Sequence, residues 1–316
     1  MSTLTVSAQE RKPHPALTSN AIYYGYGVAA DPITSGATPR VPYRDFYADL
    51  YAAPGTRIIP LDLSQELKSL GPTTSPGLLA NYVKIEAGEQ LRTSSGGTSE
   101  LFYVIQGAGA IRTAGEDITY GVGDIITIPG SSVTHFADEE TVYYWVHDAP
   151  LLRYLGARPA EPKFAPTIYP ADRLAAELRK IELNPESKNW SRKAILLGNK
   201  NFEQTMTITH VLWAMFGIVP DGARQLPHRH QSVALDFIVK AKPGAYTLVG
   251  TELDENGQIK NAVRVDWIPG STFVTPPGYW HEHRNESGEP AYVMPIQDAG
   301  LHTYLRTLDI QFYEED

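Results

Sequence analysis

The chain of 316 residues contains no cysteine. Disulfide bonds, thiolate metal ligands and a cysteine nucleophile are therefore excluded, and the redox compartment stays open. The chain also lacks any apolar run of about 18 residues, the length of a membrane-spanning helix, and residues 1–12 lack the apolar stretch of a signal peptide. We therefore expect a cytoplasmic protein with no membrane partner.

The sequence has no block of positive charge either. Lys and Arg number 27 against 36 Asp and Glu, so the formal net charge is −9 with histidine neutral. This balance argues against nucleic acid as a partner, because binding to it requires a positively charged surface. Glycine (26), proline (24) and tyrosine (18) are abundant instead, which is typical of many short strands joined by turns.

Two parts of the chain, residues 78–146 and 205–313, are rich in short runs of β-branched and aromatic residues separated by turns. Between them, residues 172–181 carry apolar side chains at i, i+4 and i+7, the spacing of one helix face. Residues 63–70 are predicted to form a shorter helix. The pattern predicts an all-β protein with short helices in its connections.

The two β-rich parts repeat the same features in the same order. Each has two glycine-initiated stretches of equal spacing and a closing stretch with a shared Asp-Ala pair; the matches are 88–96 with 222–230, 123–129 with 270–276, and 146–151 with 296–301. Such a duplication predicts two similar β-barrels of roughly a hundred residues each.

Two pairs of histidines stand out in the second part. His228 and His230 belong to one predicted strand, and His281 and His283 to another. Because side chains alternate between the two faces of a strand, the members of each pair share a face. Four imidazoles on adjacent strands indicate a metal site inside a barrel. The alternative is that they are ordinary barrel histidines, which would be costly to bury unpaired.

The spacing of these residues matches the two cupin motifs, Gly-x5-His-x-His and Gly-x5-Pro-x-Gly-x2-His-x3-Asn. The first occurs as Gly222 to His230 and the second as Gly270 to Asn285. The chain therefore resembles the bicupins, which hold two double-stranded β-helix (jelly-roll) barrels. The resemblance implies four parts, listed in chain order: an N-terminal arm (1–54), an N-terminal cupin (55–158), a linker with a helix (159–200) and a C-terminal metal-binding cupin (201–316).

In cupins the metal is held by the two histidines of the first motif, usually a glutamate a few residues further on, and the histidine of the second motif. Carried onto this chain, the ligands are His228, His230 and His281, while Ala234 stands where the glutamate is expected.

In the N-terminal repeat, Ser94 and Gly96 occupy the positions of the first two histidines, and only Glu100 and a displaced His135 remain. We expect that this barrel has lost its metal and serves packing or oligomerisation.

A three-histidine site without the carboxylate resembles the gentisate 1,2-dioxygenase and salicylate dioxygenase branch of the cupins. Residues 228–237, 244–247 and 275–285 carry phrases of that branch. The resemblance implies a non-haem Fe(II) centre with a face open to O2 and a chelating aromatic substrate, and ring opening beside a hydroxyl-bearing carbon without an external reductant. Mn or Zn is the alternative metal.

Two departures shift the predicted substrate. Gentisate dioxygenases carry iron in the N-terminal repeat, and they usually have a carboxylate-binding arginine where this chain has Asp236. Asp236 shares a face with His228 and should point into the barrel, where an anion would repel a carboxylate and accept a hydrogen bond from a hydroxyl. We therefore expect a hydroquinone-like substrate, as in hydroquinone 1,2-dioxygenase, whose large subunit is a bicupin with metal in its C-terminal half.

Three further side chains are assigned roles. Asp236 is predicted to act in catalysis and substrate binding; its alternative is a solvated or salt-bridged strand residue. His283 is predicted to face the cavity as an acid or base with a pKa near working pH, or only to hydrogen-bond a neighbour. His210 is predicted to line the substrate pocket, with a satisfied core histidine as its alternative.

The favoured function is thus an Fe(II)-dependent ring-cleaving dioxygenase of a hydroquinone-like aromatic. One alternative is a gentisate- or salicylate-type 1,2-dioxygenase. Others are a metal-dependent bicupin hydrolase, isomerase or decarboxylase, and a non-enzymatic binding or partner subunit. The expected partners are O2 and a small aromatic compound, and we expect an oligomer, formed with further copies or with a second cupin subunit.

Overall fold

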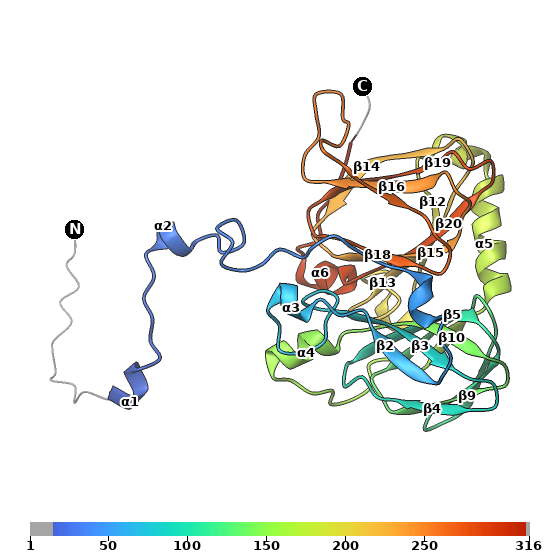
Figure 1. The fold of residues 1–316 in the computed structure, drawn as a ribbon, viewed down its shortest axis with the longest axis horizontal. Helices are drawn as coiled ribbons and strands as arrows, with labels where there is room; N and C mark the ends of the chain where they lie inside the picture. Colours follow the sequence, from blue (N-terminus) through green and yellow to red (C-terminus); the bar gives the residue numbers. More distant parts are fainter. Residues whose placement is uncertain (1–14, 314–316) are drawn as a thin grey trace. The chain divides into compact units, whose positions relative to one another are not determined.

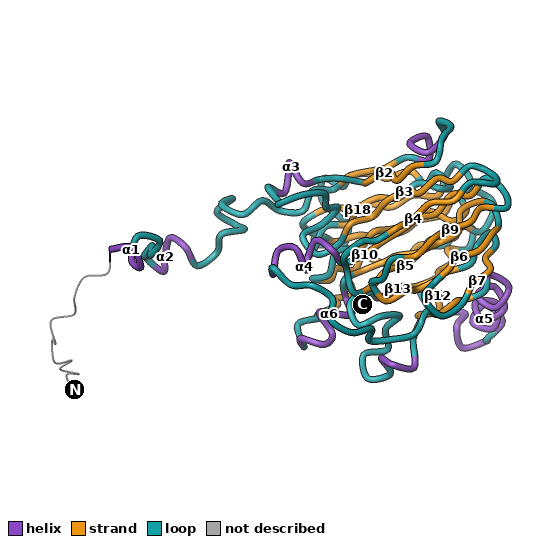
Figure 2. Tube along the Cα trace, turned by 90° about the horizontal axis from the view of Figure 1, so that it is seen from below, coloured by secondary structure: helices purple, strands orange, loops and turns teal. Residues whose placement is uncertain are grey.

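The computed structural model describes residues 15–313, and the chain divides after residue 39 into two units. The first unit holds two short helices, α1 (Pro15–Thr18) and α2 (Tyr26–Ala29), and its large apolar side chains are exposed. The second unit contains two β-barrels (Figures 1 and 2). The prediction of an all-β protein with short helices is confirmed.

The N-terminal barrel is built from a six-stranded sheet, in the order β11-β8-β5-β10-β3-β2, and a four-stranded sheet, β4-β9-β6-β7. All of its paired strands are antiparallel. Their bounds are β2 (Arg57–Pro60), β3 (Leu79–Ile85), β4 (Gln90–Thr93), β5 (Ser99–Gln106), β6 (Gly109–Arg112), β7 (Asp117–Tyr120), β8 (Ile125–Pro129), β9 (Val133–Ala137), β10 (Thr141–His147) and β11 (Thr167–Tyr169).

The C-terminal barrel repeats this plan with the sheets β1-β18-β15-β20-β13-β12 and β17-β16-β19-β14-β21. Its strands are β1 (Arg44–Phe46), β12 (Lys193–Leu197), β13 (Trp213–Val219), β14 (Arg224–His230), β15 (Ala234–Lys240), β16 (Ala245–Gly250), β17 (Val263–Asp266), β18 (Thr272–Thr275), β19 (Trp280–Asn285), β20 (Ala291–Gln297) and β21 (Ile310–Phe312).

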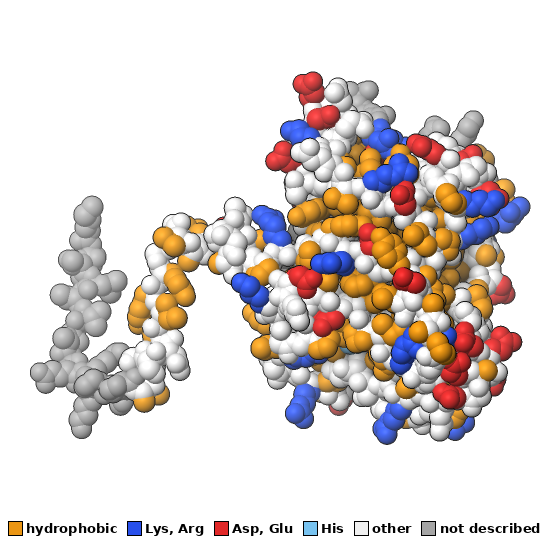
Figure 3. All heavy atoms as spheres, viewed as in Figure 1, with side chains coloured by type: hydrophobic (Ala, Val, Ile, Leu, Met, Phe, Trp, Pro, Cys, Tyr) orange, Lys and Arg blue, Asp and Glu red, His pale blue; other side chains and the backbone are white. Residues whose placement is uncertain are grey.

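The remaining elements lie outside the sheets. They are α3 (Ser64–Leu67), α4 (Ala149–Leu155), α5 (Ala171–Leu183), α6 (Ala299–Leu305) and the 3-10 helices η1 (Ala48–Tyr51), η2 (Pro185–Asn189) and η3 (Lys200–Phe202). α4 and α6 follow the last strand of the duplicated part in each barrel, and both lie on the side of the body away from α5 (Figures 1 and 2). No helix of the described residues is long and apolar enough to cross a membrane. On the face in Figure 3, acidic and basic side chains are interspersed.

The N-terminal arm ends earlier than predicted. Its boundary was placed at residue 54, but residues from Arg40 onward belong to the compact body. β1 pairs with β18, where Asp45 lies opposite Phe273, and the ring of Tyr51 contacts that of Tyr82 at 4.8 Å between centroids. The segment is polar and weakly patterned, and its strand is stabilised by a partner more than 200 residues away, so local composition could not reveal it.

The linker predicted for residues 159–200 also contributes to both barrels. β11 pairs with β8 of the N-terminal barrel, and β12 pairs with β13 of the C-terminal barrel. The helix predicted at residues 172–181 is present as α5, between these two strands. The segment therefore adds an edge strand to each six-stranded sheet, and the second of these strands begins next to the site described below.

The two barrels share a hydrophobic core because both faces of their central strands are buried. On β10, Tyr143 and Trp145 point into the N-terminal barrel, whereas Tyr144 belongs to a cluster shared with the C-terminal barrel. The Tyr144 ring stacks on Phe237 of β15 with centroids 4.9 Å apart, and its hydroxyl lies 3.0 Å from Thr272 Oγ1. Since side chains alternate along β15, the strand that turns Phe237 toward this shared core turns Asp236 into its own barrel.

Replacing Phe237 by Ala should destabilise the protein by about 3–5 kcal/mol, because it opens a cavity in the core shared by both barrels. The free energy of unfolding in urea measures this. Leu155→Ala is the control, since Leu155 is 62% exposed and its truncation should cost less than about 0.5 kcal/mol. Equal midpoints for Phe237→Ala and Leu155→Ala would show that the shared core contributes little to stability.

Candidate metal centre

Three histidines converge inside the C-terminal barrel. β14 and β19 are antiparallel neighbours, and their register sets His228 directly opposite His281, while His230 follows two residues along β14. The ring centroids of His228 and His281 lie 3.9 Å apart. Each histidine offers one ligand nitrogen, and these nitrogens all lie within 4.8 Å of one another. The three side chains are buried, so the group can hold a metal ion.

Hydrogen bonds orient two of these imidazoles. His230 Nδ1 lies 2.8 Å from the backbone oxygen of Ser232, and His281 Nδ1 lies 3.1 Å from that of Tyr279. Because a carbonyl oxygen only accepts, Nδ1 carries the proton in both rings and Nε2 keeps its lone pair. His230 Nε2 and His228 Nδ1 are buried without a hydrogen-bond partner among the described residues. Rings held in this way fit a metal ligand.

Burial also keeps the three imidazoles neutral. It lowers the pKa of His230 to about 4, and it lowers the pKa of His228 and His281 well below the ordinary histidine value, with the neighbouring imidazoles adding to the effect. A metal binds the neutral ring, so no proton has to be displaced near pH 7. Ala234 lies on β15 opposite Thr275, and the ligand group of the described residues includes no carboxylate.

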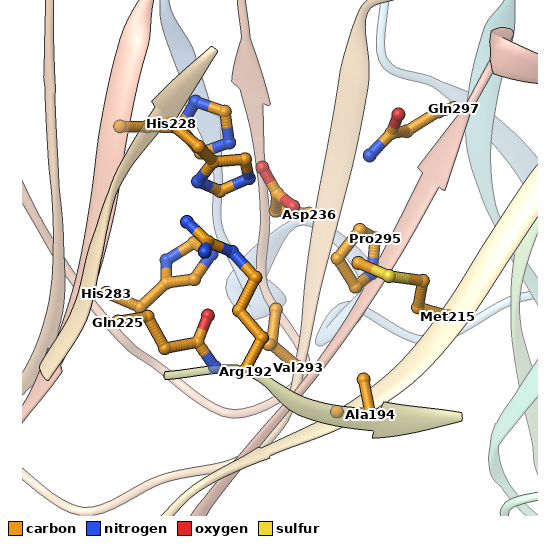
Figure 4. A pocket seen from close by; sticks show the side chains of 12 residues that line it. Arg192, Ala194, Met215, Gln225, His228, Asp236, His283, Val293, Pro295 and Gln297 are labelled. Atoms are coloured by element: carbon orange, nitrogen blue, oxygen red, sulfur yellow. The ribbon is translucent and has the colours of Figure 1, made fainter. Parts of the chain in front are cut away.

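A cavity adjoins the histidines, and Figure 4 shows the side chains around it. It combines the imidazoles with one guanidinium, one carboxyl and several small or apolar groups. The lining residues are Arg192, Ala194, Met215, Gly217, Gln225, His228, Asp236, His281, His283, Val293, Pro295 and Gln297. They come from β12 and its preceding residue, β13, β14, β15, β19 and β20.

Arg192 is the charged lining residue that sequence analysis missed. It stands just before β12, inside the predicted linker, and Figure 4 shows its side chain extending toward His228 and His283. Its Nη2 donates to the backbone oxygen of Leu226 at 2.5 Å, while its Nε is buried without a partner among the described residues. Burial lowers the pKa of Arg192 to about 10, so the cavity holds a cation near pH 7. Extending the C-terminal barrel back to residue 192 would have included it.

Asp236 lies in the cavity wall, as its position on β15 predicted. It is 2% exposed, and Thr275 Oγ1 donates to its Oδ2 at 2.6 Å. Burial raises the pKa of Asp236 to about 7. The carboxyl is therefore not a fixed negative charge near pH 7, which weakens the argument that it must repel a carboxylated ligand.

His283 also lines the cavity, but its predicted pKa was wrong. Burial lowers the pKa of His283 to about 3, so its ring is neutral at working pH. Its Nδ1 lies 2.8 Å from Thr247 Oγ1, and the indole nitrogen of Trp267 donates to the same oxygen at 2.8 Å. The ring is thus held in place as a neutral hydrogen-bonding group facing the cavity.

His210, in contrast, is not among the lining residues of this cavity. It precedes β13, and its Nε2 lies 2.8 Å from Thr98 Oγ1 of the N-terminal barrel. Its ring contacts Phe202 at 5.5 Å and Phe164 at 6.3 Å between centroids. The predicted role in the pocket is therefore wrong, because the chain before β13 reaches the other barrel and not the interior of its own.

The interior of the N-terminal barrel is filled by aromatic rings. Phe102 stacks on Trp145 with centroids 5.4 Å apart and contacts His135 at 5.1 Å. Glu100 is fully buried and accepts hydrogen bonds from Ser95 Oγ at 2.8 Å and Trp145 Nε1 at 2.9 Å. Among the described residues no group of three metal-ligating side chains is found there, and the role of this barrel in packing or oligomerisation stays a prediction.

No protein-family model matches the chain. In sequence it is similar to gentisate 1,2 dioxygenase 1 of Aquipseudomonas alcaligenes, with 30% identity over 130 residues that cover 41% of this chain and 34% of that protein. It is also similar to 5-nitrosalicylic acid 1,2-dioxygenase of Bradyrhizobium sp, with 32% identity over 95 residues that cover 29% of this chain and 45% of that protein. The matched segments thus span less than half of each relative.

In structure the chain is similar to salicylate 1,2-dioxygenase from Pseudaminobacter salicylatoxidans, with a TM-score of 0.71 and 13% identity over 95% of this chain and 97% of that one. The chain therefore has the bicupin fold, as its motifs predicted. The predicted resemblance to gentisate and salicylate dioxygenases is confirmed in sequence and in fold.

His281→Ala should lower the affinity for Fe(II), or for Zn(II) as a probe, by more than about a hundredfold. Removing a group that only orients a metal ligand already lowers metal affinity by about 10- to 100-fold, and removing the ligand itself should lower it at least as much. Metal content after dialysis and competition with a chelator measure this. His210→Ala is the control and should keep its metal. A His281→Ala protein that retains one equivalent would contradict the assignment.

Proposed function

We propose that the chain is an Fe(II)-dependent dioxygenase that opens the ring of a hydroxylated aromatic compound. The observation that carries the proposal is a trio of neutral imidazoles, His228, His230 and His281, without a carboxylate ligand, beside a cavity that holds a cation. A ferrous ion bound by neutral ligands alone would keep its full charge and supply open positions for O2 and the substrate oxygens. Both atoms of O2 enter the product, so no external reductant is required.

The same cavity favours a substrate that carries a carboxylate next to its hydroxyl. Arg192 brings a buried guanidinium whose Nε has no partner among the described residues, and such a group pairs strongly with a carboxylate. The similar proteins named above act on gentisate, 5-nitrosalicylic acid and salicylate, and each compound has this arrangement. In its protonated form, Asp236 does not repel the carboxylate of such a substrate. This departs from the substrate that the sequence favoured.

A hydroquinone-like substrate is the second candidate, and Asp236 is the observation that favours it. Thr275 occupies its Oδ2, which leaves Oδ1 to accept a hydrogen bond from a substrate hydroxyl. With a pKa raised to about 7, this carboxyl can take up the hydroxyl proton and return it near neutral pH. The role is useful for either substrate, so Asp236 alone does not decide between them.

We propose that His283 orients the substrate through a hydrogen bond. Trp267 donates to Thr247 Oγ1, which leaves the hydroxyl proton of Thr247 for His283 Nδ1. The imidazole proton then sits on Nε2 and can be donated to a substrate oxygen. Because burial keeps the ring neutral, His283 positions the substrate and does not titrate during turnover.

The broader expectations stay proposals. An oligomer, with further copies or a second cupin subunit, would be checked by light scattering. If the protein is instead a hydrolase, isomerase or decarboxylase, we expect Mn or Zn in the site. None of these reactions consumes O2.

The protein loaded anaerobically with Fe(II) should consume one O2 per substrate molecule with salicylate or gentisate. An oxygen electrode measures the uptake, and the loss of aromatic absorbance reports ring opening. Hydroquinone tests the second candidate in the same assay. The zinc-loaded protein is the control and should consume none. Absence of uptake with all three phenols would exclude the proposed reaction for these substrate classes.

Arg192→Gln should raise KM for the carboxylated substrate about 10- to 100-fold and change kcat little, because it removes a charge-assisted hydrogen bond made to substrate and transition state alike. Steady-state O2 uptake measures both constants. Asp236→Asn is the matched variant. It should lower kcat, while its KM for the carboxylated substrate should stay near the wild-type value. An unchanged KM in Arg192→Gln would mean that the guanidinium does not contact the substrate.

A further inference from the structure

The last described strand of the chain borders the metal-binding strand. β21 pairs with β14 in antiparallel register, with Phe312 opposite His228 and Ile310 opposite His230. Within residues 15–313, the corresponding strand of the N-terminal barrel, β4, pairs with β9 alone and forms the edge of its sheet. The C-terminal strand is thus an addition to the barrel that carries the histidines, placed against the strand that holds two of them.

Phe312 contacts two groups of the site at once. Residues directly opposite each other on antiparallel strands share a face, and the Phe312 ring lies nearly parallel to His228, at 5.9 Å between centroids and 14° between planes. The guanidinium carbon of Arg192 lies 4.7 Å from the centre of the same ring. Phe312 is 52% exposed, so packing in the core does not explain its position.

Arg192 needs such support because few groups fix its orientation. Its described hydrogen bonds run from Nη2 to the backbone oxygen of Leu226 and from Nη1 to Ser191 Oγ at 3.1 Å. Both bonds engage the terminal nitrogens of the group, and Nε has no partner among the described residues. A guanidinium over an aromatic face is attracted to the ring and loses much of its freedom to rotate. Together with these two hydrogen bonds, the ring therefore restricts how Arg192 presents its donors.

We propose that Phe312 is a positioning residue that holds the Arg192 guanidinium for the carboxylate of the substrate. β21 thereby determines the preference for carboxylated over uncharged phenols, although it lies outside the cavity. The inference rests on the proposed function, since it assigns Arg192 to substrate binding. Phe312 acts through Arg192 and does not touch the reacting atoms.

The test compares two probes on protein loaded with Zn(II), which needs no O2 and no turnover. Calorimetry gives the dissociation constants of salicylate and of phenol for wild type, Phe312→Leu and Phe312→Tyr. Phe312→Leu keeps an apolar side chain but removes the ring face, so salicylate should bind about three- to tenfold more weakly while phenol changes less than twofold. Phe312→Tyr should restore salicylate binding. Bound zinc is measured in every variant and should be equal.

Two further results decide between mechanisms. In an Arg192→Gln background, Phe312→Leu should have no additional effect on salicylate, because the group it positions is gone. In iron-loaded protein, Phe312→Leu should raise KM for salicylate and leave kcat within about twofold.

The proposal is overturned if Phe312→Leu binds salicylate as wild type does, or if it weakens both probes equally, which would indicate a general role beside His228. It is also overturned if wild type binds neither probe. Salicylate binding that depends on Phe312, without O2 uptake by the iron protein, would support the positioning role and contradict the proposed reaction.

Discussion

The antiparallel register of β14 against β19 is the constraint on which the site depends. It sets His228 opposite His281 and brings three ligand nitrogens within 4.8 Å of one another. Burying these rings together makes protonation unfavourable, so they stay neutral and keep lone pairs available for a metal. A shift of β14 by one residue against β19 would turn His228 and His230 to the outer face and abolish the site, because side chains alternate along a strand.

The two barrels share one duplicated architecture but differ in what their interiors contain. In the N-terminal barrel, aromatic rings such as Phe102 and Trp145 stack on each other in the hydrophobic interior. Its outward-facing residues, Tyr144 among them, pack against Phe237 on the back of the strand that carries Asp236. The barrel without ligands therefore stabilises the wall of the cavity in the other barrel. A repeat in which no metal-ligating group is found among the described residues can therefore still contribute to the shared core.

The charges of the cavity decide which ligands it suits. Arg192 stays cationic, because even after burial its pKa is about 10, while burial brings the pKa of Asp236 to about 7. Near neutral pH the cavity thus holds one fixed positive charge and one group that gains or loses a proton. This pair of charges is the basis for proposing an anionic aromatic substrate with a hydroxyl to deprotonate.

Sequence alone predicted the fold and the candidate ligand trio, because both depend on local spacing: the duplicated motifs, the shared strand face of His228 and His230, and the absence of a carboxylate at Ala234. It also placed Asp236 and His283 on the inner face of their strands. Only the tertiary structure showed that Arg192 lines the cavity, that His210 lies outside its lining, and that residues 40–54 belong to the compact body. These outcomes depend on contacts between distant segments. The ionisation of Asp236 and His283 was likewise undetermined, because a pKa follows from burial and neighbours, and both arise only when the barrel closes.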